Sequence, residues 1–374
     1  MDLGAKTRVL LVDDSTFMRK VLQSIIAADP QMEVVGEARD GREAIAMAES
    51  LRPDVVSMDI MMPHVDGLQA TQAIMSRNPR PIVIVSSETK EGADITLKAL
   101  ELGAIDFIPK PTNGVDLDMQ GLRDELCRKL KVASRVRVIR TIVRSGAKPP
   151  AASSYSEGKF TPSDAAVSGN LAGSGNARFP LVIVAASTGG PQALMQFIPA
   201  LPANFAASVL LVQHMPGTFT AQFAKQLGEV AAVQVKEAEN NDALRAGTVY
   251  VCPGAQHMRV MANGRLSVEM GERIHGYRPC ADVTMETAAC FAGPMTVGVV
   301  LTGMGADGSK GVQAVKAAGG HVIAQDEVTS VIFGMPAEAI KTGMVDQVLA
   351  IEAIVPAIEK RILYVMGAAR VGAV

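Results

Sequence analysis

The stretch 179-FPLVIVAASTGGP-191 decides the fold of the second half of this chain. An apolar, β-branched run leads to Ser187, two glycines follow, and Pro191 suits the first position of a helix, where its missing N–H costs nothing. This order predicts a strand, a sharp turn and a helix, with Ser187 at the carboxyl edge of a sheet. The arrangement is that of a nucleophile elbow, although Ala185 stands where the G-x-S-x-G motif has glycine. Taken alone, the stretch equally fits an ordinary glycine-rich turn.

Two further polar residues follow apolar strands in the same half. His214 comes directly after the predicted strand Ser208–Gln213, and Asp307 lies in a glycine-rich turn after the predicted strand Met295–Thr302. Because the carboxyl ends of parallel strands meet at one edge, we expect both residues near Ser187. A serine needs an imidazole to take its proton, and the imidazole needs a carboxylate to fix its tautomer. The three residues are therefore candidate catalytic groups; the alternative is that the histidine and the aspartate only cap their strands.

The first half of the chain alternates short apolar strands with helical patterns. The predicted strands are Val9–Val12, Met32–Gly36, Asp54–Asp59, Pro81–Ser87 and Asp106–Pro111. Such alternation predicts a parallel sheet covered by helices on both faces. The second half alternates in the same way and adds a hairpin at Val260–Val268 around an Asn-Gly turn. The fold class is therefore α/β in both halves.

Polar residues at the strand ends of the first half converge on one crevice. They are three carboxylates, a hydroxyl and an amine: Asp13, Asp14, Asp59, Ser86 and Lys110. Three crowded carboxylates repel one another unless a hard cation joins them, and Mg²⁺ prefers oxygen ligands. Lys110 supplies a counter-charge, and the hydroxyl of Ser86 suits a phosphoryl oxygen. A set of solvated strand-end charges is the alternative, and five such residues together disfavour it.

Length and composition set the outer limits. A chain of 374 residues predicts two domains. The sequence from Gly146 onward is rich in Ser, Ala, Gly and Pro, which predicts a flexible linker at 136–178 between domains at 1–135 and 179–374. No apolar run approaches the length of about 20 residues that a membrane span needs. A formal net charge of −2 does not indicate binding to nucleic acid. The N-terminus lacks a signal-peptide core and the four cysteines are scattered, so we expect a cytoplasmic protein with reduced thiols.

The first domain resembles the receiver domain of two-component response regulators. The resemblance rests on VDDS at 12–15, MDIMMP at 58–63, Asp66-Gly67, VSS at 85–87 and Lys110-Pro111. It implies a flavodoxin-like fold in which Asp59 accepts a phosphoryl group. It further implies that Asp13 and Asp14, with Asp59, hold the Mg²⁺ needed for that phosphorylation. Ser86 and Lys110 are then the residues that contact the phosphoryl group.

The second domain resembles the catalytic domain of the CheB family, the chemotaxis methylesterases. The matching segments are ASTGG at 186–190, QHMP at 213–216, YVCPG at 250–254, RP at 278–279 and LTGMGADG at 301–308. The resemblance implies a doubly wound hydrolase-type domain with a mostly parallel sheet and a hairpin. Ser187 is then the nucleophile, His214 the general base and acid, and Asp307 the orienting carboxylate. Oxyanion donors are implied near the Met304 backbone, with Thr188 close by.

A receiver followed by this domain is the full architecture of the CheB family. The resemblance therefore implies a phosphorylation-activated enzyme, a protein-glutamate methylesterase and protein-glutamine glutaminase. Its substrates would be methyl-accepting chemotaxis receptors, its phosphodonor a chemotaxis histidine kinase, and its place the receptor arrays at the inner face of the membrane. Ester hydrolysis itself would need no cofactor. The alternatives are a non-enzymatic phospho-switch that binds receptor or kinase, and the same enzyme in a non-flagellar chemosensory array.

The resemblance also implies how the receiver controls the enzyme. Phe107 occupies the position of the family's aromatic switch residue, and the Lys110–Pro111 peptide bond is expected to be cis. The unphosphorylated receiver would pack over the mouth of the active site. Phosphorylation would draw in Ser86, reposition Phe107 and change the surface that packs against the hydrolase. We therefore expect the contacts between the domains to involve residues close to the catalytic groups.

Overall fold

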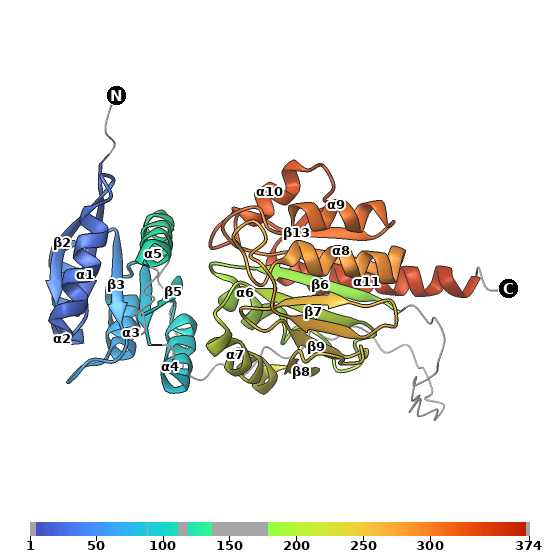
Figure 1. The fold of residues 1–374 in the computed structure, drawn as a ribbon, viewed down its shortest axis with the longest axis horizontal. Coiled ribbons are helices and arrows are strands. Elements are labelled where there is room, and N and C mark those ends of the chain that lie inside the picture. The colour runs from blue at the N-terminus through green and yellow to red at the C-terminus, as the bar shows by residue number, and fades with distance from the viewer. Residues whose placement is uncertain (1–4, 88, 111–118, 137–178, 372–374) are drawn as a thin grey trace, which may run out of the picture.

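The computed structural model describes residues 5–87, 89–110, 119–136 and 179–371. Two α/β sheets stand side by side within these ranges, the first domain on the left and the second on the right in Figure 1. Apart from Val136, the predicted linker lies outside the described residues, as does Pro111 with its predicted cis bond. Among the described helices, none is both long and apolar enough to cross a membrane.

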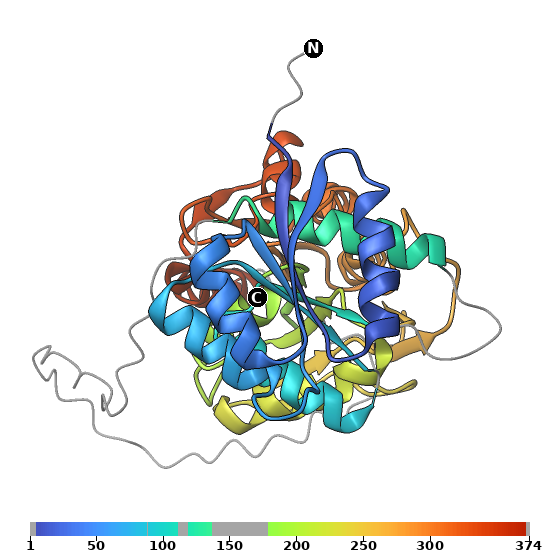
Figure 2. The same ribbon diagram turned by 90° about the vertical axis from the view of Figure 1, so that its left-hand side faces the viewer.

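The first domain is a five-stranded parallel sheet in the order β2-β1-β3-β4-β5. Its strands are β1 (Thr7–Val12), β2 (Met32–Ala38), β3 (Val55–Asp59), β4 (Ile82–Ser86) and β5 (Asp106–Pro109). Its helices are α1 (Thr16–Ala27), α2 (Gly41–Leu51), α3 (Gly67–Arg77), α4 (Lys90–Glu101) and α5 (Met119–Ala133). Figure 2 shows these helices on both faces of the sheet, and β3 and β4 are buried at every residue. Continuous apolar runs are typical of strands buried in this way. The predicted flavodoxin-like fold is confirmed.

Helix α3 begins directly against the third strand. Asp66 caps it by accepting the N–H of Gln69 at 2.7 Å, and the Gln69 side chain accepts the N–H of Asp66 at 3.3 Å. This capping box satisfies two of the backbone groups that a helix terminus leaves unpaired. A Cβ on Gly67 would lie 2.0 Å from the carbonyl oxygen of Asp59. The glycine is therefore required for the helix to start beside the strand end that carries Asp59.

The second domain is a seven-stranded parallel sheet in the order β14-β13-β12-β6-β7-β9-β8. Its strands are β6 (Leu181–Ala186), β7 (Ser208–Gln213), β8 (Gln234–Glu237), β9 (Thr248–Val251), β12 (Thr296–Val300), β13 (His321–Gln325) and β14 (Gln347–Leu349). A separate antiparallel hairpin comprises β10 (His257–Val260) and β11 (Leu266–Glu269). The predicted doubly wound sheet with a hairpin is confirmed.

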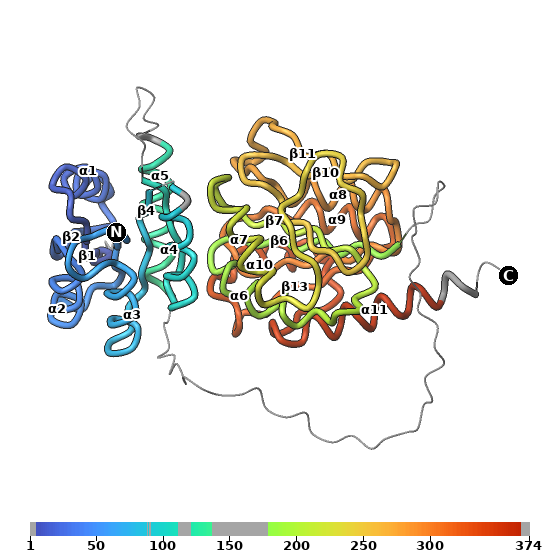
Figure 3. Tube along the Cα trace, turned by 90° about the horizontal axis from the view of Figure 1, so that it is seen from below, coloured from blue at the N-terminus to red at the C-terminus, as the bar shows by residue number. Residues whose placement is uncertain are grey.

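Helices cover both faces of the second sheet. They are α6 (Gly190–Phe197), α7 (Gly217–Val230), α8 (Ala281–Ala292), the 3₁₀ turn η1 (Gly293–Met295), α9 (Ser309–Ala317), α10 (Met335–Lys341) and α11 (Ile351–Val371). Side chains of α6, α7 and α11 form the core on one face, and those of α8, α9, α10 and the hairpin form it on the other. In Figure 3, α11 runs along the domain and its end points away from the receiver.

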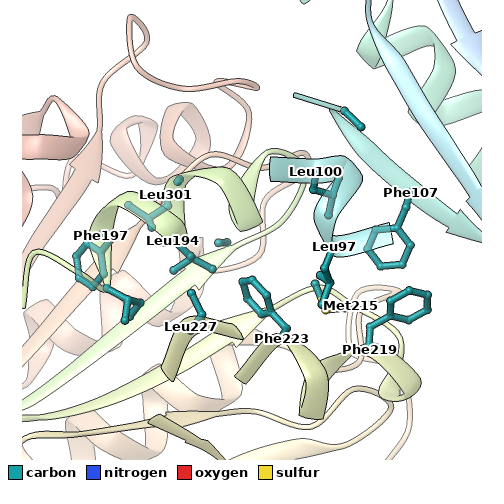
Figure 4. Packing of buried hydrophobic residues seen from close by; sticks show 14 of the residues in the cluster. Leu97, Leu100, Phe107, Leu194, Phe197, Met215, Phe219, Phe223, Leu227 and Leu301 are labelled. Carbon is teal, nitrogen blue, oxygen red and sulfur yellow. The ribbon is translucent and has the colours of Figure 1, made fainter. Parts of the chain in front are cut away.

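The two domains pack against each other through α4 and β5 of the first and α6 and α7 of the second. Figure 4 shows Leu97 beside Phe223 and Phe107 beside Phe219 of α7, and the buried cluster continues across this boundary. The ring of Phe107 lies 4.4 Å from that of Phe219, measured between centroids. Aromatic pairs in this range are stabilising beyond their buried area. The predicted switch residue is therefore part of the domain interface.

Candidate active site

Ser187 lies at the turn between β6 and α6. Its N–H donates to the carbonyl of Thr302 at 3.0 Å, which fixes the turn against the neighbouring strand end. Gly189 has a φ of +76°, and a Cβ there would lie 2.4 Å from Val331. Glycine is therefore needed both for the backbone conformation and for the space. Pro191 stands in the first turn of α6. The strand, turn and helix predicted around Ser187 are present.

The register of the sheet brings His214 beside Ser187. Strands β6 and β7 pair Ala186 with Gln213, so the next residue of each strand is Ser187 and His214. The N–H of His214 continues the ladder to the carbonyl of Ala186 at 3.0 Å. The buried amide of Gln213 donates to the carbonyls of Ser187 at 2.9 Å and of His214 at 3.1 Å. The two candidate residues are thus held together by backbone geometry.

Asp307 reaches the histidine from the loop that follows β12. Its Oδ2 lies 2.7 Å from Nε2 of His214. The same loop passes close to the serine, since a Cβ on Gly303 would lie 2.8 Å from Cβ of Ser187. Within the described residues, Nδ1 of His214 is buried without a hydrogen-bond partner, and no hydrogen bond joins Ser187 to the ring. Nucleophile–base contacts are often loose before a substrate binds. All three predicted residues therefore lie at one edge of the sheet.

The carboxylate of Asp307 is surrounded by hydrogen-bond donors that the sequence patterns did not reveal. Besides His214, the donors are N–H groups of Ala281 (2.7 Å), Asp282 (3.0 Å) and Gly308 (3.0 Å) and the thiol of Cys280 (3.1 Å). The first two belong to the first turn of α8, where backbone N–H groups favour an anion. Burial would raise the pKa of Asp307, but the histidine and these donors outweigh it and lower the pKa to about 2. This carboxylate is therefore ionised at neutral pH.

The two residues expected near an oxyanion, Thr188 and Met304, both touch the receiver. Within the described part of the chain, their backbone N–H groups donate no hydrogen bond. The hydroxyl of Thr188 donates to Oδ2 of Asp106 at 2.5 Å, and Nη1 of Arg128 lies 3.2 Å from Sδ of Met304. Strand β5 and helix α5 of the receiver thus reach residues adjacent to Ser187 and to the Asp307 loop.

A second contact ties the receiver to the helix that follows Ser187. Nε2 of Gln192, in α6, donates to the carbonyls of Leu100 at 3.1 Å and of Ala104 at 2.9 Å. Gln226 of α7 is hydrogen-bonded to Glu101 at the end of α4. Because α6 begins three residues after Ser187, these bonds hold the receiver over the edge of the sheet where the candidate catalytic residues lie.

The strand ends of the receiver form a second polar site. Nζ of Lys110 lies 2.7 Å from Oδ2 of Asp59 and 2.9 Å from Oδ2 of Asp13. Carboxylate oxygens of Asp13, Asp14 and Asp59 all lie within 4.8 Å of one another. Three hard oxygen donors at this spacing fit a Mg²⁺ ion. Burial raises the pKa of Asp59 to about 6, against the opposing effect of Lys110.

Ser86 belongs to the same site by position but points elsewhere. Its hydroxyl lies 3.4 Å from the carbonyl oxygens of Ser87 and of Gly92, in α4. The side chain is fully buried in this orientation. The structure therefore brings together four of the five predicted receiver residues, with the hydroxyl of the fifth directed toward α4 instead of Asp59.

Comparisons with known proteins give the family that each domain matches. Residues 182–358 match the family model for the CheB methylesterase, and residues 9–120 match that for the response regulator receiver domain. The protein-glutamate methylesterase/protein-glutamine glutaminase of Pyrococcus horikoshii is 47% identical to this chain and covers 99% of it, over 97% of its own length. The chain belongs to the CheB methylesterase family. The predicted family membership is confirmed.

Two further proteins are similar to this chain, one over nearly all of it and one over its second domain. The protein-glutamate methylesterase/protein-glutamine glutaminase of Symbiobacterium thermophilum is 45% identical, covering 95% of this chain and 97% of its own length. The crystal structure of the Thermotoga maritima CheB methylesterase catalytic domain is 40% identical, covers 49% of this chain and 98% of that chain, and has a TM-score of 0.48. The CheB match at 182–358 includes Ser187, His214 and Asp307, and the receiver match includes Asp59.

Proposed function

We propose that this protein is a phosphorylation-activated methylesterase that hydrolyses γ-glutamyl methyl esters on chemotaxis receptors and also deamidates receptor glutamines. The observation that carries the proposal is the pairing of His214 with a deeply ionised Asp307 beside Ser187, at the edge that the receiver covers. Full-length relatives bear the names of both activities. These names support an enzyme over a phospho-switch without catalysis.

The two ring nitrogens of His214 have different tasks in this proposal. Asp307 accepts a hydrogen bond from Nε2–H, so Nδ1 is the nitrogen left free to accept the proton of Ser187. The serine oxygen then attacks the ester carbonyl and forms a tetrahedral oxyanion. Asp307 holds the tautomer and stabilises the imidazolium that develops. Because its pKa is about 2, it stays a carboxylate throughout.

Collapse of the tetrahedral intermediate releases the product alcohol. The N–H groups of Thr188 and Met304 face no other partner in the described chain and suit the oxyanion. His214 returns its proton to the leaving oxygen, methanol departs, and an acyl-enzyme forms on Ser187. Water, deprotonated by the same histidine, then yields the free glutamate and regenerates the serine. With a glutamine substrate, the departing molecule is ammonia.

The receiver supplies the control. Asp59 is the proposed phosphoacceptor, and Asp13, Asp14 and Asp59 would hold Mg²⁺, which neutralises phosphoryl oxygens when it is bound. Lys110 already contacts Asp59 and would pair with the phosphoryl group. Ser86 would have to turn away from α4 to reach it. Ester hydrolysis uses only protein groups in this proposal.

Closure of the receiver explains how phosphorylation raises activity. In the closed arrangement, Asp106 accepts a hydrogen bond from the hydroxyl of Thr188, and Arg128 contacts the sulfur of Met304. Phe107 belongs to β5, the strand that leads to Lys110, and its ring packs against Phe219 of the hydrolase, so its movement would loosen the interface. The added phosphate can shift this equilibrium only through interactions that differ between the closed and open states. A tenfold activation needs about 1.4 kcal/mol of such a difference.

The partners follow from this chemistry. The substrates would be methylated receptor helices, and the phosphodonor a chemotaxis histidine kinase, with the enzyme acting at receptor arrays. The test is release of labelled methanol from a methyl-labelled receptor fragment by the full-length protein, with and without a small phosphodonor. We expect slow release without it and faster release with it. No methanol release under either condition, with the receiver phosphorylated, would contradict the proposed activity.

A further inference from the structure

Tyr277 lies face to face with the imidazole of His214. The ring centroids are 4.3 Å apart and the ring planes differ by 14°. The tyrosine belongs to a tight turn in which Ile274 and Tyr277 exchange backbone hydrogen bonds of 3.0 and 2.9 Å. Three residues later the chain reaches Cys280 and the start of α8, which bind Asp307. The segment from Tyr277 to Ala281 therefore contacts both the face of the His214 ring and the carboxylate of Asp307 that is hydrogen-bonded to this ring.

The hydroxyl of Tyr277 reaches the loop that carries Met304. It donates to the carbonyl of Met304 in a long hydrogen bond of 3.4 Å. The loop can pass beneath the phenol only because Gly305, with a φ of +98°, has no side chain; a Cβ there would lie 2.0 Å from the hydroxyl oxygen. Tyr277 thus contacts both His214, the candidate base, and the loop that carries Met304, a candidate oxyanion donor. No sequence motif singled it out.

The stack has a consequence for proton transfer. When the histidine accepts the serine proton, its ring becomes a cation, and a cation over an aromatic face is favoured by the ring's negative quadrupole. The neutral ring gains less from the same contact, so the stack stabilises the transition state more than the ground state. Among the described residues, two charged groups face this pair. Asp307, from the loop after β12, is hydrogen-bonded to His214 and raises the pKa of Tyr277, and Arg128, from α5, lowers the pKa of Tyr277.

We propose that Tyr277 is a positioning residue for the hydrolysis reaction: its ring fixes the orientation of the His214 imidazole and stabilises the cation formed on it. This inference rests on the proposed function, in which His214 is the base. The hydroxyl has the smaller task of aligning the Met304 loop, since its hydrogen bond is long. The ring should therefore matter for turnover, and the hydroxyl should matter little.

The kinetic test uses the full-length protein with saturating phosphodonor and a methyl-labelled receptor fragment. Tyr277→Leu removes the ring, Tyr277→Phe keeps it, and Tyr364→Leu makes the same change on the exposed face of α11. We expect Tyr277→Leu to lower kcat about tenfold with an unchanged KM, which is the signature of an interaction gained in the transition state. Tyr277→Phe should restore most of the rate, and Tyr364→Leu should match the wild type.

A second readout does not depend on activity. In protein carrying ¹⁵N-labelled histidine, the ring signals of His214 are identified by their loss in His214→Gln. The ring current of a stacked phenol shifts the imidazole protons, so Tyr277→Leu should move them and Tyr277→Phe should not. Unmoved signals in Tyr277→Leu would refute the stack, and a wild-type kcat or a rise in KM alone would refute the positioning role.

Two further outcomes keep the proposals apart. If Tyr277→Leu does not fold, Tyr277→Met makes the same test with a flexible apolar side chain. An equal loss in Tyr277→Phe and Tyr277→Leu would assign the effect to the hydroxyl and overturn the inference about the ring. Undiminished methanol release by Ser187→Ala would instead overturn the proposed function, whatever the signals of His214 show.

Discussion

Asp59 and Asp307 are two buried aspartates at the carboxyl edges of two parallel sheets, and their acidities are opposite. Their exposed fractions are 1% and 2%, and each has one basic partner at 2.7 Å, Lys110 and His214 respectively. Burial raises the pKa of Asp59 to about 6 despite its partner. For Asp307, burial also raises the pKa, but the hydrogen bond and charge of His214, together with the other donors, outweigh it and lower the pKa to about 2. Burial and one basic neighbour therefore do not determine the acidity.

The difference lies in the groups around each carboxylate: His214 lowers the pKa of Asp307 most and the other donors lower it further, whereas the nearby carboxylate of Asp13 raises the pKa of Asp59. Asp307 accepts hydrogen bonds from three backbone N–H groups and a thiol, whereas Asp59 accepts one backbone N–H, from Met61 at 3.2 Å. A carboxylate whose lone pairs are saturated is fixed in place and stabilises a neighbouring charge. A carboxylate with free lone pairs is available to a cation or a phosphoryl group. The surroundings of the two aspartates therefore suit the different roles proposed for them.

The largest expected effect comes from removing the proposed nucleophile, Ser187, or the proposed base, His214. Ser187→Ala and His214→Ala should each lower kcat by about 10⁶-fold, and the double variant should be no worse, because the two residues act as a unit. Methanol release from a labelled receptor fragment is the measurement. Asp59→Asn provides the control, since it should keep the unstimulated rate. Additive losses in the double variant would contradict a shared proton transfer.

The same substitution at the two aspartates should have very different effects on turnover. Asp307→Asn should lower kcat about 10⁴-fold, because an amide cannot stabilise the imidazolium and presents its NH₂ to groups that are themselves donors. Asp59→Asn should leave unstimulated turnover intact. Steady-state kinetics without phosphodonor measures both. Equal effects of the two substitutions would show that the donors around Asp307 do not set its role.

Metal removal should affect the receiver site around Asp59 and leave the site around Ser187 active. With phosphodonor present, chelation by EDTA or Asp59→Asn should each abolish activation of about tenfold, since phosphorylation needs Mg²⁺ and its acceptor. The unstimulated rate should survive chelation, because the Ser187 site uses no metal in the proposal. Phosphoprotein yield and methanol release are measured together. Loss of unstimulated hydrolysis in EDTA, in the whole chain or in a 179–374 fragment, would make the hydrolase metal-dependent.

The smallest expected effects come from the contacts that close the receiver. Asp106→Asn and Gln192→Ala each weaken an interdomain hydrogen bond, and a loss of about 1 kcal/mol should raise unstimulated turnover about fivefold. The turnover of a 179–374 fragment should likewise be higher than that of the unphosphorylated whole protein. Glu49→Gln, on an exposed part of α2, is the matched control. A fragment slower than the intact chain would mean that the receiver does not act as a cover.

The sequence predicts the strand-end residues well because buried parallel strands leave a plain signal. Continuous apolar runs lead up to Ser187 and His214, and in the structure β6 and β7 end directly before these two residues, at Ala186 and Gln213. Four strands of the second sheet were not predicted, and two of them, Thr248–Val251 and His321–Gln325, are apolar and largely buried. Gln234–Glu237 and Gln347–Leu349 are edge strands of four and three residues, too short for a periodic pattern to stand out.

Contacts made by tertiary packing could not be predicted from the sequence. Tyr277 and Cys280 act on the site from a segment without regular structure, and Asp106 reaches Thr188 only because two domains dock. The choice of Nε2 for the bond to Asp307 depends on the direction from which a loop arrives. The orientation of Ser86 toward α4 is likewise a property of packing, which residue type does not reveal.

The pairing of Ala186 with Gln213 has a consequence for how this enzyme can change over time. Because Ser187 and His214 directly follow paired residues of adjacent strands, the separation of their backbones follows from the spacing of β-strands, about 4.8 Å. Insertions or substitutions in the loops above the sheet leave that separation untouched. New substrate preferences and new regulatory partners can therefore evolve in those loops while the reactive pair is inherited unchanged.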